Sequence, residues 1–215
     1  MDERFHEAKP TPLRTPEGCS LARAAAFNEY NVKLFFDKLL ECYVRNESFA
    51  DGTRVFNLDE TATITQQKHH LKVIARRGSK QVSKITSGEK GTLVTTCMIA
   101  SAAGNWLPPA MVFPRVKFHN RMINGASRGT LGLASKTGWM NSDIFINVMK
   151  HFIKCSGSSK TNPSLLLYDN HESHISLQCI ELAKDNGVTV LTFPPHSTHK
   201  LQPLDVGIFA LSNFL

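Results

Sequence analysis

Three aspartates have the residue type and the surroundings for metal-dependent chemistry. Asp169 directly follows the apolar run 165–168, and Asp59 directly follows a second apolar stretch, 54–58. Asp205 lies just after Pro203, a residue suited to the first turn of a helix. If the two stretches are neighbouring strands and the helix packs across their ends, the three carboxylates meet at one edge of a sheet.

Clustered carboxylates of this kind are typical ligands of Mg²⁺ or Mn²⁺, which prefer oxygen donors and complete their shell with water and substrate phosphates. Two such ions, about 3.5–4 Å apart, activate an attacking water or hydroxyl and stabilise the leaving oxygen. The predicted chemistry is cleavage or transfer of phosphodiester bonds at a two-metal site.

Each aspartate taken alone has a simpler interpretation. Asp59 can cap a turn, and Asp169 can cap the helix that follows it. Asp205 in a first helical turn interacts favourably with the helix dipole. Only the combination of the three favours a shared site.

The elements that must position these acids can be predicted from hydrophobic patterns. The run 165–168 lacks the polar alternation of a half-exposed strand, so it indicates a central strand that is covered on both faces. In sheets with such strands, ligands gather outside the carboxyl ends, which is where Asp169 stands.

The rest of the chain predicts alternating helices and strands. Helices are expected from about Asn31, from about Asn141, up to Gly187 and from Pro203; strands are expected at 54–58, 92–101, 107–113, 165–168 and 188–193, with an irregular stretch at 124–138. Early antiparallel strands followed by β-α-β crossovers describe an α/β fold with a mixed sheet flanked by helices.

The charge of the chain favours an anionic partner. There are 25 Lys and Arg against 18 Asp and Glu, and the sequence pI is near 9.3. Much of the excess lies in a basic ribbon, residues 68–90, which contains the candidate phosphate contacts Lys72, Arg76, Arg77, Lys80 and Lys84. A solvated hairpin without a partner is the alternative interpretation of this ribbon.

Composition also excludes several classes of protein. The five cysteines are odd in number, widely spaced and without a Cys-x-x-Cys pair, which argues against a disulfide framework and for an intracellular compartment. No stretch offers the ~18 uninterrupted apolar residues of a membrane span, so we expect a soluble protein without a membrane partner.

The histidines around the acids allow a different metal site. His171 and His174 form one H-x-x-H pair, and His196 and His199 form another, so four imidazoles could bind zinc. Capping, substrate contacts or support of the acids explain these histidines with fewer assumptions. We expect His171, His174 and Lys200 to contribute to nucleic-acid binding.

Several segments also carry a family resemblance. They are "FNLDET", "RRGSKQVSKITSGEKGTLVT", "GNWLPPAMVFPR", "GWMNSDIFINVMKHFIK" and, most specific, the block from "LYDNHESH" to "QPLDVGIF". Together they resemble the DDE superfamily endonuclease domain of pogo and Tigger-type transposases, the group related to jerky and centromere protein B. The resemblance extends over nearly the whole chain, from about Thr15 to Phe209.

The resemblance implies a ribonuclease H-like fold and a nuclear, DNA-cutting transposase with strand-transfer activity. It assigns Asp59, Asp169 and Asp205 as the catalytic, metal-binding acids, with DNA as the partner and a homodimer as one possible assembly. Residues 1–18 contain three prolines and no apolar period, which predicts an arm or linker remnant. For residues 19–215 the resemblance implies a catalytic core that is shorter at its C-terminus than in the family. A catalytically inactive DNA-binding or interaction module derived from a transposase is the alternative.

Overall fold

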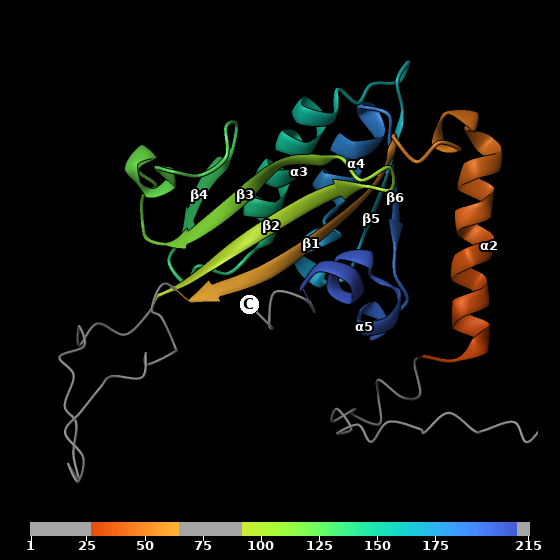
Figure 1. Cartoon of the computed structure of the whole chain (residues 1–215), viewed down its shortest axis with the longest axis horizontal. Coiled ribbons are helices and arrows are strands. Elements are labelled where there is room, and N and C mark those ends of the chain that lie inside the picture. Colours follow the sequence, from red (N-terminus) through yellow and green to blue (C-terminus); the bar gives the residue numbers. More distant parts are fainter. Residues whose placement is uncertain (1–26, 65–91, 210–215) are drawn as a thin grey trace, which may run out of the picture.

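The fold is built on a six-stranded mixed sheet with the order β4-β3-β2-β1-β5-β6 (Figure 1). The computed structural model describes residues 27–64 and 92–209. The strands are β1 (Val55–Ile64), β2 (Leu93–Ser101), β3 (Trp106–Pro114), β4 (Leu131–Ser135), β5 (Ser164–Tyr168) and β6 (Val188–Thr192).

The strand directions place most carboxyl ends at one edge of the sheet. β2 is antiparallel to both β1 and β3, whereas the pairs β1–β5, β5–β6 and β3–β4 are parallel. All strands except β2 therefore point the same way, and residues that follow β1, β3, β4 and β5 come out on the same side.

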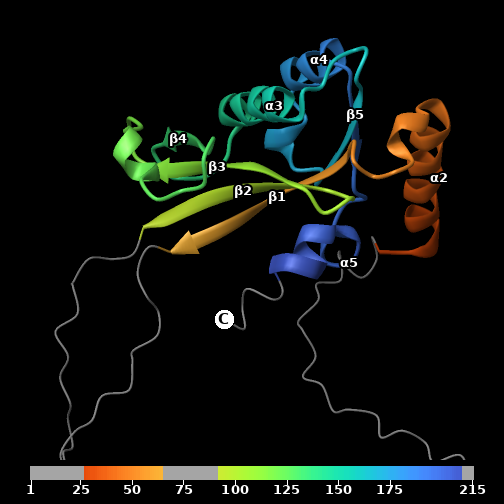
Figure 2. The ribbon, with the colours of Figure 1, turned by 45° about the horizontal axis from the view of Figure 1, so that its top comes forward.

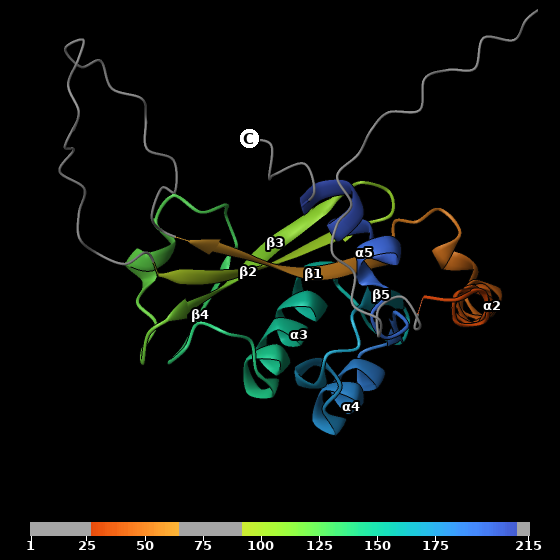
Figure 3. The same ribbon diagram turned by 90° about the horizontal axis from the view of Figure 1, so that it is seen from below.

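Helices cover both faces of the sheet (Figures 2 and 3). They are α2 (Glu29–Arg45), α3 (Ser142–Ser156), α4 (Leu177–Asp185) and α5 (Thr198–Leu201), with the shorter turns η1 (Glu47–Phe49), η2 (Asn120–Ile123) and η3 (Glu172–His174) and a π-helical turn η4 (Leu204–Phe209). α3 and α4 pack on one face, and α5 lies on the other.

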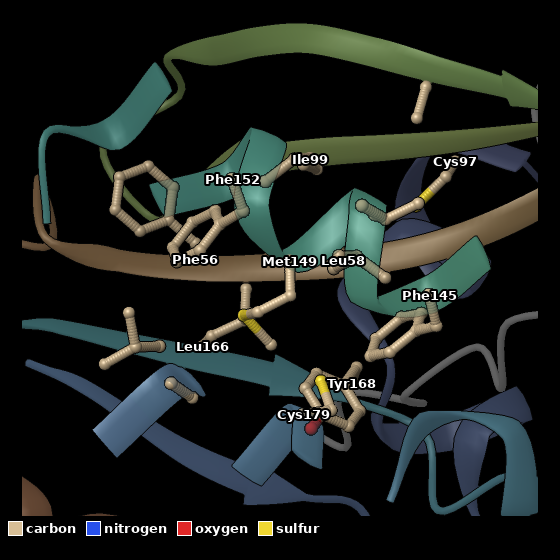
Figure 4. Close-up of a cluster of buried hydrophobic side chains, with 14 of the residues drawn as sticks. Phe56, Leu58, Cys97, Ile99, Phe145, Met149, Phe152, Leu166, Tyr168 and Cys179 are labelled. Carbon is tan, nitrogen blue, oxygen red and sulfur yellow. The ribbon is translucent and has the colours of Figure 1, made fainter. Parts of the chain in front are cut away.

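Side-chain alternation along β1 and β5 divides the core into two layers. Phe56, Leu58, Leu166 and Tyr168 pack under α3 and α4 with Phe145, Met149 and Phe152 (Figure 4). Val55, Leu165 and Leu167 point to the opposite face, where they meet α2 through Phe35. All five residues of β5 are buried, so the prediction of a central strand covered on both faces is confirmed.

The predicted mixed sheet is confirmed, and three local expectations are corrected. β1 does not end before Asp59 but continues to Ile64, because its partner β2 is long enough to pair with all of it. The irregular stretch 124–138 contains β4, and α2 begins at Glu29, after its N-cap Asn28, rather than at about Asn31. The predicted arm and the basic ribbon lie outside the described residues.

Candidate active site

Asp59 and Asp169 are delivered to neighbouring positions by β1 and β5. These strands run parallel, with Asn57 opposite Leu167, and each aspartate lies two residues further along its own chain segment. The prediction that the two acids follow adjacent parallel strands is confirmed for the pairing. It is corrected for the boundary, since Asp59 lies within β1 whereas Asp169 comes just after β5.

Asp205 reaches the same place from the C-terminal turn η4. The backbone N–H of Leu204, its immediate neighbour, donates a hydrogen bond of 3.0 Å to the Oδ1 atom of Asn57. The Nδ2 atom of Asn57 donates to the carbonyl of Leu167, also at 3.0 Å. One buried side chain thus connects β1, β5 and the turn that carries the third acid.

Asn57 was not identified from the sequence, although its position carries a signal. It is a polar residue inside the apolar stretch 54–58, on the same face of β1 as Asp59, and it is 7% exposed. A buried amide needs partners on both its oxygen and its nitrogen, which points to a role in connecting elements.

We predict that Asn57→Ala lowers the free energy of unfolding by about 2–4 kcal/mol. The substitution leaves the Leu204 N–H and the Leu167 carbonyl buried without partners, and each lost partner costs about 1–3 kcal/mol. Urea denaturation measures the change. Asn147→Ala on the exposed side of α3 is the control, and equal midpoints for both variants would contradict the bridging role.

The electrostatics of the three acids show that they influence one another. Burial raises the pKa of Asp59 to about 7, and the negative charges of Asp205 and Asp169 add to the rise. Burial also raises the pKa of Asp205, again with a contribution from Asp169. Burial is the larger cause for both acids, and repulsion between like charges in a low dielectric adds to it.

Two buried oxygen atoms beside this cluster lack hydrogen-bond partners. They are Oδ2 of Asp59 and Oε1 of Gln202, a side chain only 1% exposed on the turn before η4. The other oxygen of Asp59, Oδ1, accepts a hydrogen bond of 2.7 Å from the Glu60 N–H. Buried acceptors without donors are rare in folded proteins, and a cation is one kind of partner that satisfies them.

His174 links Asp169 to a fourth carboxylate. Its Nδ1 atom lies 2.5 Å from Oδ1 of Asp169, and its Nε2 atom lies 2.8 Å from Oε1 of Glu60. The ring stacks on Phe145 with centroids 4.2 Å apart, and the Tyr168 hydroxyl donates to the His174 carbonyl at 3.3 Å. The imidazole is therefore fixed by hydrogen bonds at both ring nitrogens and by stacking on Phe145.

This arrangement favours a charged imidazolium between two carboxylates. Burial alone lowers the pKa of His174, but the hydrogen bonds to Asp169 and Glu60 outweigh it and raise the pKa to about 9. Burial likewise raises the pKa of Asp169, and here the bond and charge of His174 prevail and lower it. Asp169 is thereby kept ionised and fixed in orientation.

Glu60 was also missed by the sequence reasoning. Its signal is the alternation along β1, because Phe56 and Leu58 face α3 and α4, and the next residue on that face is Glu60. A carboxylate that continues an apolar face needs a buried cationic partner, and His174 supplies it.

The other predicted contact residues are distributed differently. His174 is 5% exposed and bonded to carboxylates on both ring nitrogens, so its geometry favours support of Asp169 over the nucleic-acid contact expected from the sequence. His171 and Lys200 are exposed, and the backbone N–H of His171 donates a hydrogen bond to Oδ1 of Asp169. The ribbon residues Lys72, Arg76, Arg77, Lys80 and Lys84 lie outside the described residues.

Ready-made metal cages are absent from the described part of the chain. Within residues 27–64 and 92–209, no three His, Cys, Asp or Glu side chains converge as a complete metal shell. The four imidazoles of the zinc alternative do not meet, because His174 is bound to carboxylates and His199 lies beside Phe27. The three aspartates lie close enough to affect one another's pKa values but do not by themselves form a complete metal shell.

Comparison with known proteins identifies the family. Residues 91–213, more than half of the chain, match the family model of the DDE superfamily endonuclease, a range that includes Asp169 and Asp205. A curated protein from Cochliobolus lunatus, MFS-type transporter clz9, is 46% identical over 77 residues, which are 35% of this chain and 8% of that protein. Because the match covers so little of that protein, its activity cannot be assigned to this chain. None of the described helices is long and apolar enough to cross a bilayer.

Solved transposase structures share the fold. The Mos1 transposase paired-end complex with left transposon end is 15% identical, with a TM-score of 0.54 over 97% of this chain and 53% of that chain. The Mos1 strand transfer complex gives a TM-score of 0.56 at 15% identity, over 98% of this chain and 52% of the other. This chain therefore spans about half the length of the solved transposase chains that it matches.

These findings confirm two expectations from the sequence. The ribonuclease H-like mixed sheet flanked by helices is confirmed by the structural matches, and the superfamily is confirmed by the family model. The pogo and Tigger subtype stays a prediction. The protein belongs to the DDE superfamily of endonucleases.

Proposed function

We propose that this domain cleaves DNA phosphodiester bonds, and transfers the resulting strands, with the help of Mg²⁺ or Mn²⁺. The observation that carries the proposal is the proximity of Asp59, Asp169 and Asp205 at one edge of the sheet, where the charges of Asp205 and Asp169 help to raise the pKa of Asp59. DNA as substrate is supported by the family and by the shared fold of a transposase solved with a transposon end.

The donor set fits a hard divalent cation. Asp59 offers a buried oxygen, Oδ2, that has no hydrogen-bond partner, and Asp169 and Asp205 supply further carboxylate oxygens. Bound cations would activate the attacking water or hydroxyl and stabilise the leaving oxygen. Two Mos1 paired-end complexes were solved with Mn and with Mg, which supports this choice of metal by analogy.

The remaining residues prepare the acids for this role. His174 holds Asp169 ionised and oriented, while Glu60 balances the charge of the imidazole on its other side. Asn57 fixes the start of η4 and with it the position of Asp205. This support is the kind of arrangement that orients ligands before a metal binds.

We also propose a nuclear location, where such a domain meets DNA, and a homodimer as one possible assembly. A non-catalytic DNA-binding module is the second candidate function. It is favoured by one observation: the described acids do not form a complete metal shell by themselves.

A nicking assay on supercoiled plasmid DNA tests the catalytic proposal. We expect Mg²⁺- or Mn²⁺-dependent nicking by the parent and at least a hundredfold loss in Asp205→Asn, since one ligand of the metal site is removed. Asp205 is a cleaner target than Asp169, whose substitution also disturbs His174. Asp185→Asn at the exposed end of α4 is the matched control.

Metal binding is measured separately from cleavage. Mn²⁺ should raise the melting temperature of the parent and of Asp185→Asn, and raise it less in Asp205→Asn, because stabilisation follows affinity for the folded state. A shift without nicking supports a binding module that keeps its metal site. Equal shifts in all three proteins would remove Asp205 from the site.

A further inference from the structure

A second group of basic residues lies on described elements, away from the three acids. Residues 92–142 contain no Asp or Glu, and their charged residues are all basic: Arg115, Lys117, Arg121, Arg128 and Lys136. All five are exposed. We call these five residues the β3–β4 basic surface, and they are distinct from the basic ribbon at 68–90.

The strand directions bring two of the five residues, Arg115 and Lys136, to the end of the sheet toward which β1 also points, whereas Arg128 precedes β4 and lies at the other end of that strand. Arg115 directly follows β3, and Lys136 directly follows β4, two strands that point the same way as β1. Pro114 pairs with Ser135, so the two basic residues leave the sheet side by side. Figure 1 shows the tips of β1 and β3 pointing toward the same side of the molecule.

Strand register gives the distance between the surface and the acids. Asp59 pairs with Met98 and Ala62 pairs with Thr95, which in turn pairs with Val112, so Arg115 lies about six residues beyond Asp59 along the direction of β1. At ~3.3 Å per residue this is roughly 20 Å, close to the length of about six base pairs of B-DNA. A duplex held at the acids can therefore extend onto the basic surface.

The backbone of this segment is anchored. Phe118 packs so closely over Gly132 that an added Cβ there would lie 2.1 Å from its ring, and its ring centroid is 6.1 Å from that of Phe113. The Arg115 N–H donates to the Ser135 carbonyl at 2.9 Å, which ties the end of β3 to the end of β4. A fixed backbone lowers the entropy lost when exposed cations bind phosphates.

From this arrangement we infer that the β3–β4 basic surface binds the phosphate backbone of duplex DNA within about six base pairs of the site of cleavage. Exposed Lys and Arg without neighbouring acids contact phosphates and release counterions, which gives affinity without base specificity. Trp139 is 59% exposed, and its carbonyl accepts a hydrogen bond from the hydroxyl of Ser135, the residue before Lys136. The inference rests on the proposed function for the position of the cut and on charge and geometry for the binding.

The test measures binding of a fluorescent 30-base-pair duplex in EDTA at several salt concentrations, so that cleavage plays no part. The variant combines Lys117→Ala, Arg121→Ala, Arg128→Ala and Lys136→Ala. The control removes four exposed lysines from other elements, at Lys38, Lys150, Lys154 and Lys184. Both variants lose the same net charge, so long-range attraction changes equally in the two.

A plot of log affinity against log salt has a negative slope. We expect this slope to become shallower by about three in the variant and to stay near the parental value in the control. Equal slopes in variant and control, or tenfold tighter binding of a double-stranded RNA of the same sequence by the parent, would overturn the inference. If the variant shows the expected change in salt slope but the parent shows no nicking, the proposed cleavage is wrong and the inference about the basic surface stands. If the parent nicks DNA but the variant keeps the parental salt slope, the proposed cleavage stands and the inference about the basic surface is wrong.

Discussion

Asp59→Asn is expected to reduce metal-dependent DNA cleavage by about a thousandfold or more and, at the same time, to stabilise the metal-free protein. Burial, and after it the negative charge of Asp205, raises the pKa of Asp59 to about 7. Loss of several kcal/mol of transition-state stabilisation accounts for the first effect. The stabilisation follows because the substitution removes a buried negative charge that neighbouring carboxylates repel.

The stabilisation should depend on pH with a definite sign. An aspartate whose pKa is raised on folding binds its proton more tightly in the folded state, so the parent loses stability as pH rises from about 4, the unfolded value, to about 7. The asparagine variant lacks this loss. The two proteins should be similar near pH 4 and differ by on the order of 2–4 kcal/mol above pH 7.

Chemical denaturation in EDTA across pH 4–8 measures this difference. Asp51→Asn is the control, because Asp51 is exposed and its bonds to the hydroxyl and N–H of Thr53 lower its pKa, which predicts no stabilisation on neutralisation. A parent that is as stable as Asp59→Asn at pH 8 would show that Asp59 carries no unfavourable charge. In that case the argument for a cation at its free oxygen would fail.

The sequence predicted the sheet edge well because local patterns determine it. The unbroken apolar run before Asp169 favours a strand covered on both faces, as found, and the parallel neighbour β1 places Asp59 beside it. The boundary of β1 could not be predicted from its own residues. Its extension to Ile64 depends on pairing with β2, a partner 29 positions further along the chain.

The supporting residues of the site were harder to find for a similar reason. The role of Asn57 depends on the arrival of Leu204 from the far end of the chain, and no local pattern encodes that contact. The strand β4 was missed because Gly132, which the packing of Phe118 requires, makes the sequence around it look irregular. Polar and glycine positions acquire their meaning only from their tertiary partners.

His174→Phe is expected to cost about 3–5 kcal/mol of stability near pH 6, the range found when one member of a buried ion pair is removed. Phenylalanine keeps the ring packing on Phe145 but removes both donors, which leaves Asp169 and Glu60 facing each other without a cation. Each carboxylate then has an unpaired charge in a partly buried place. His119→Phe, an exposed histidine, should cost far less.

The pH dependence distinguishes this explanation from a simple loss of packing. The pKa of His174 is raised from 6.5 to about 9 in the folded state, so its contribution is complete below about pH 6.5 and disappears as pH rises through about 9. The stability difference between parent and His174→Phe should therefore shrink between pH 6.5 and 9.5. A packing defect would give a difference that does not change with pH.

A double-mutant cycle with Glu60→Gln identifies the partner. If the charge of Glu60 is what His174 neutralises, the cost of His174→Phe should be smaller by about 1–3 kcal/mol when Glu60 is already neutral. His174→Gln, which keeps one donor, should fall between the parent and His174→Phe. Additive costs at pH 6 would mean that the imidazole and Glu60 do not interact, and Asp169 would then be oriented by its backbone alone.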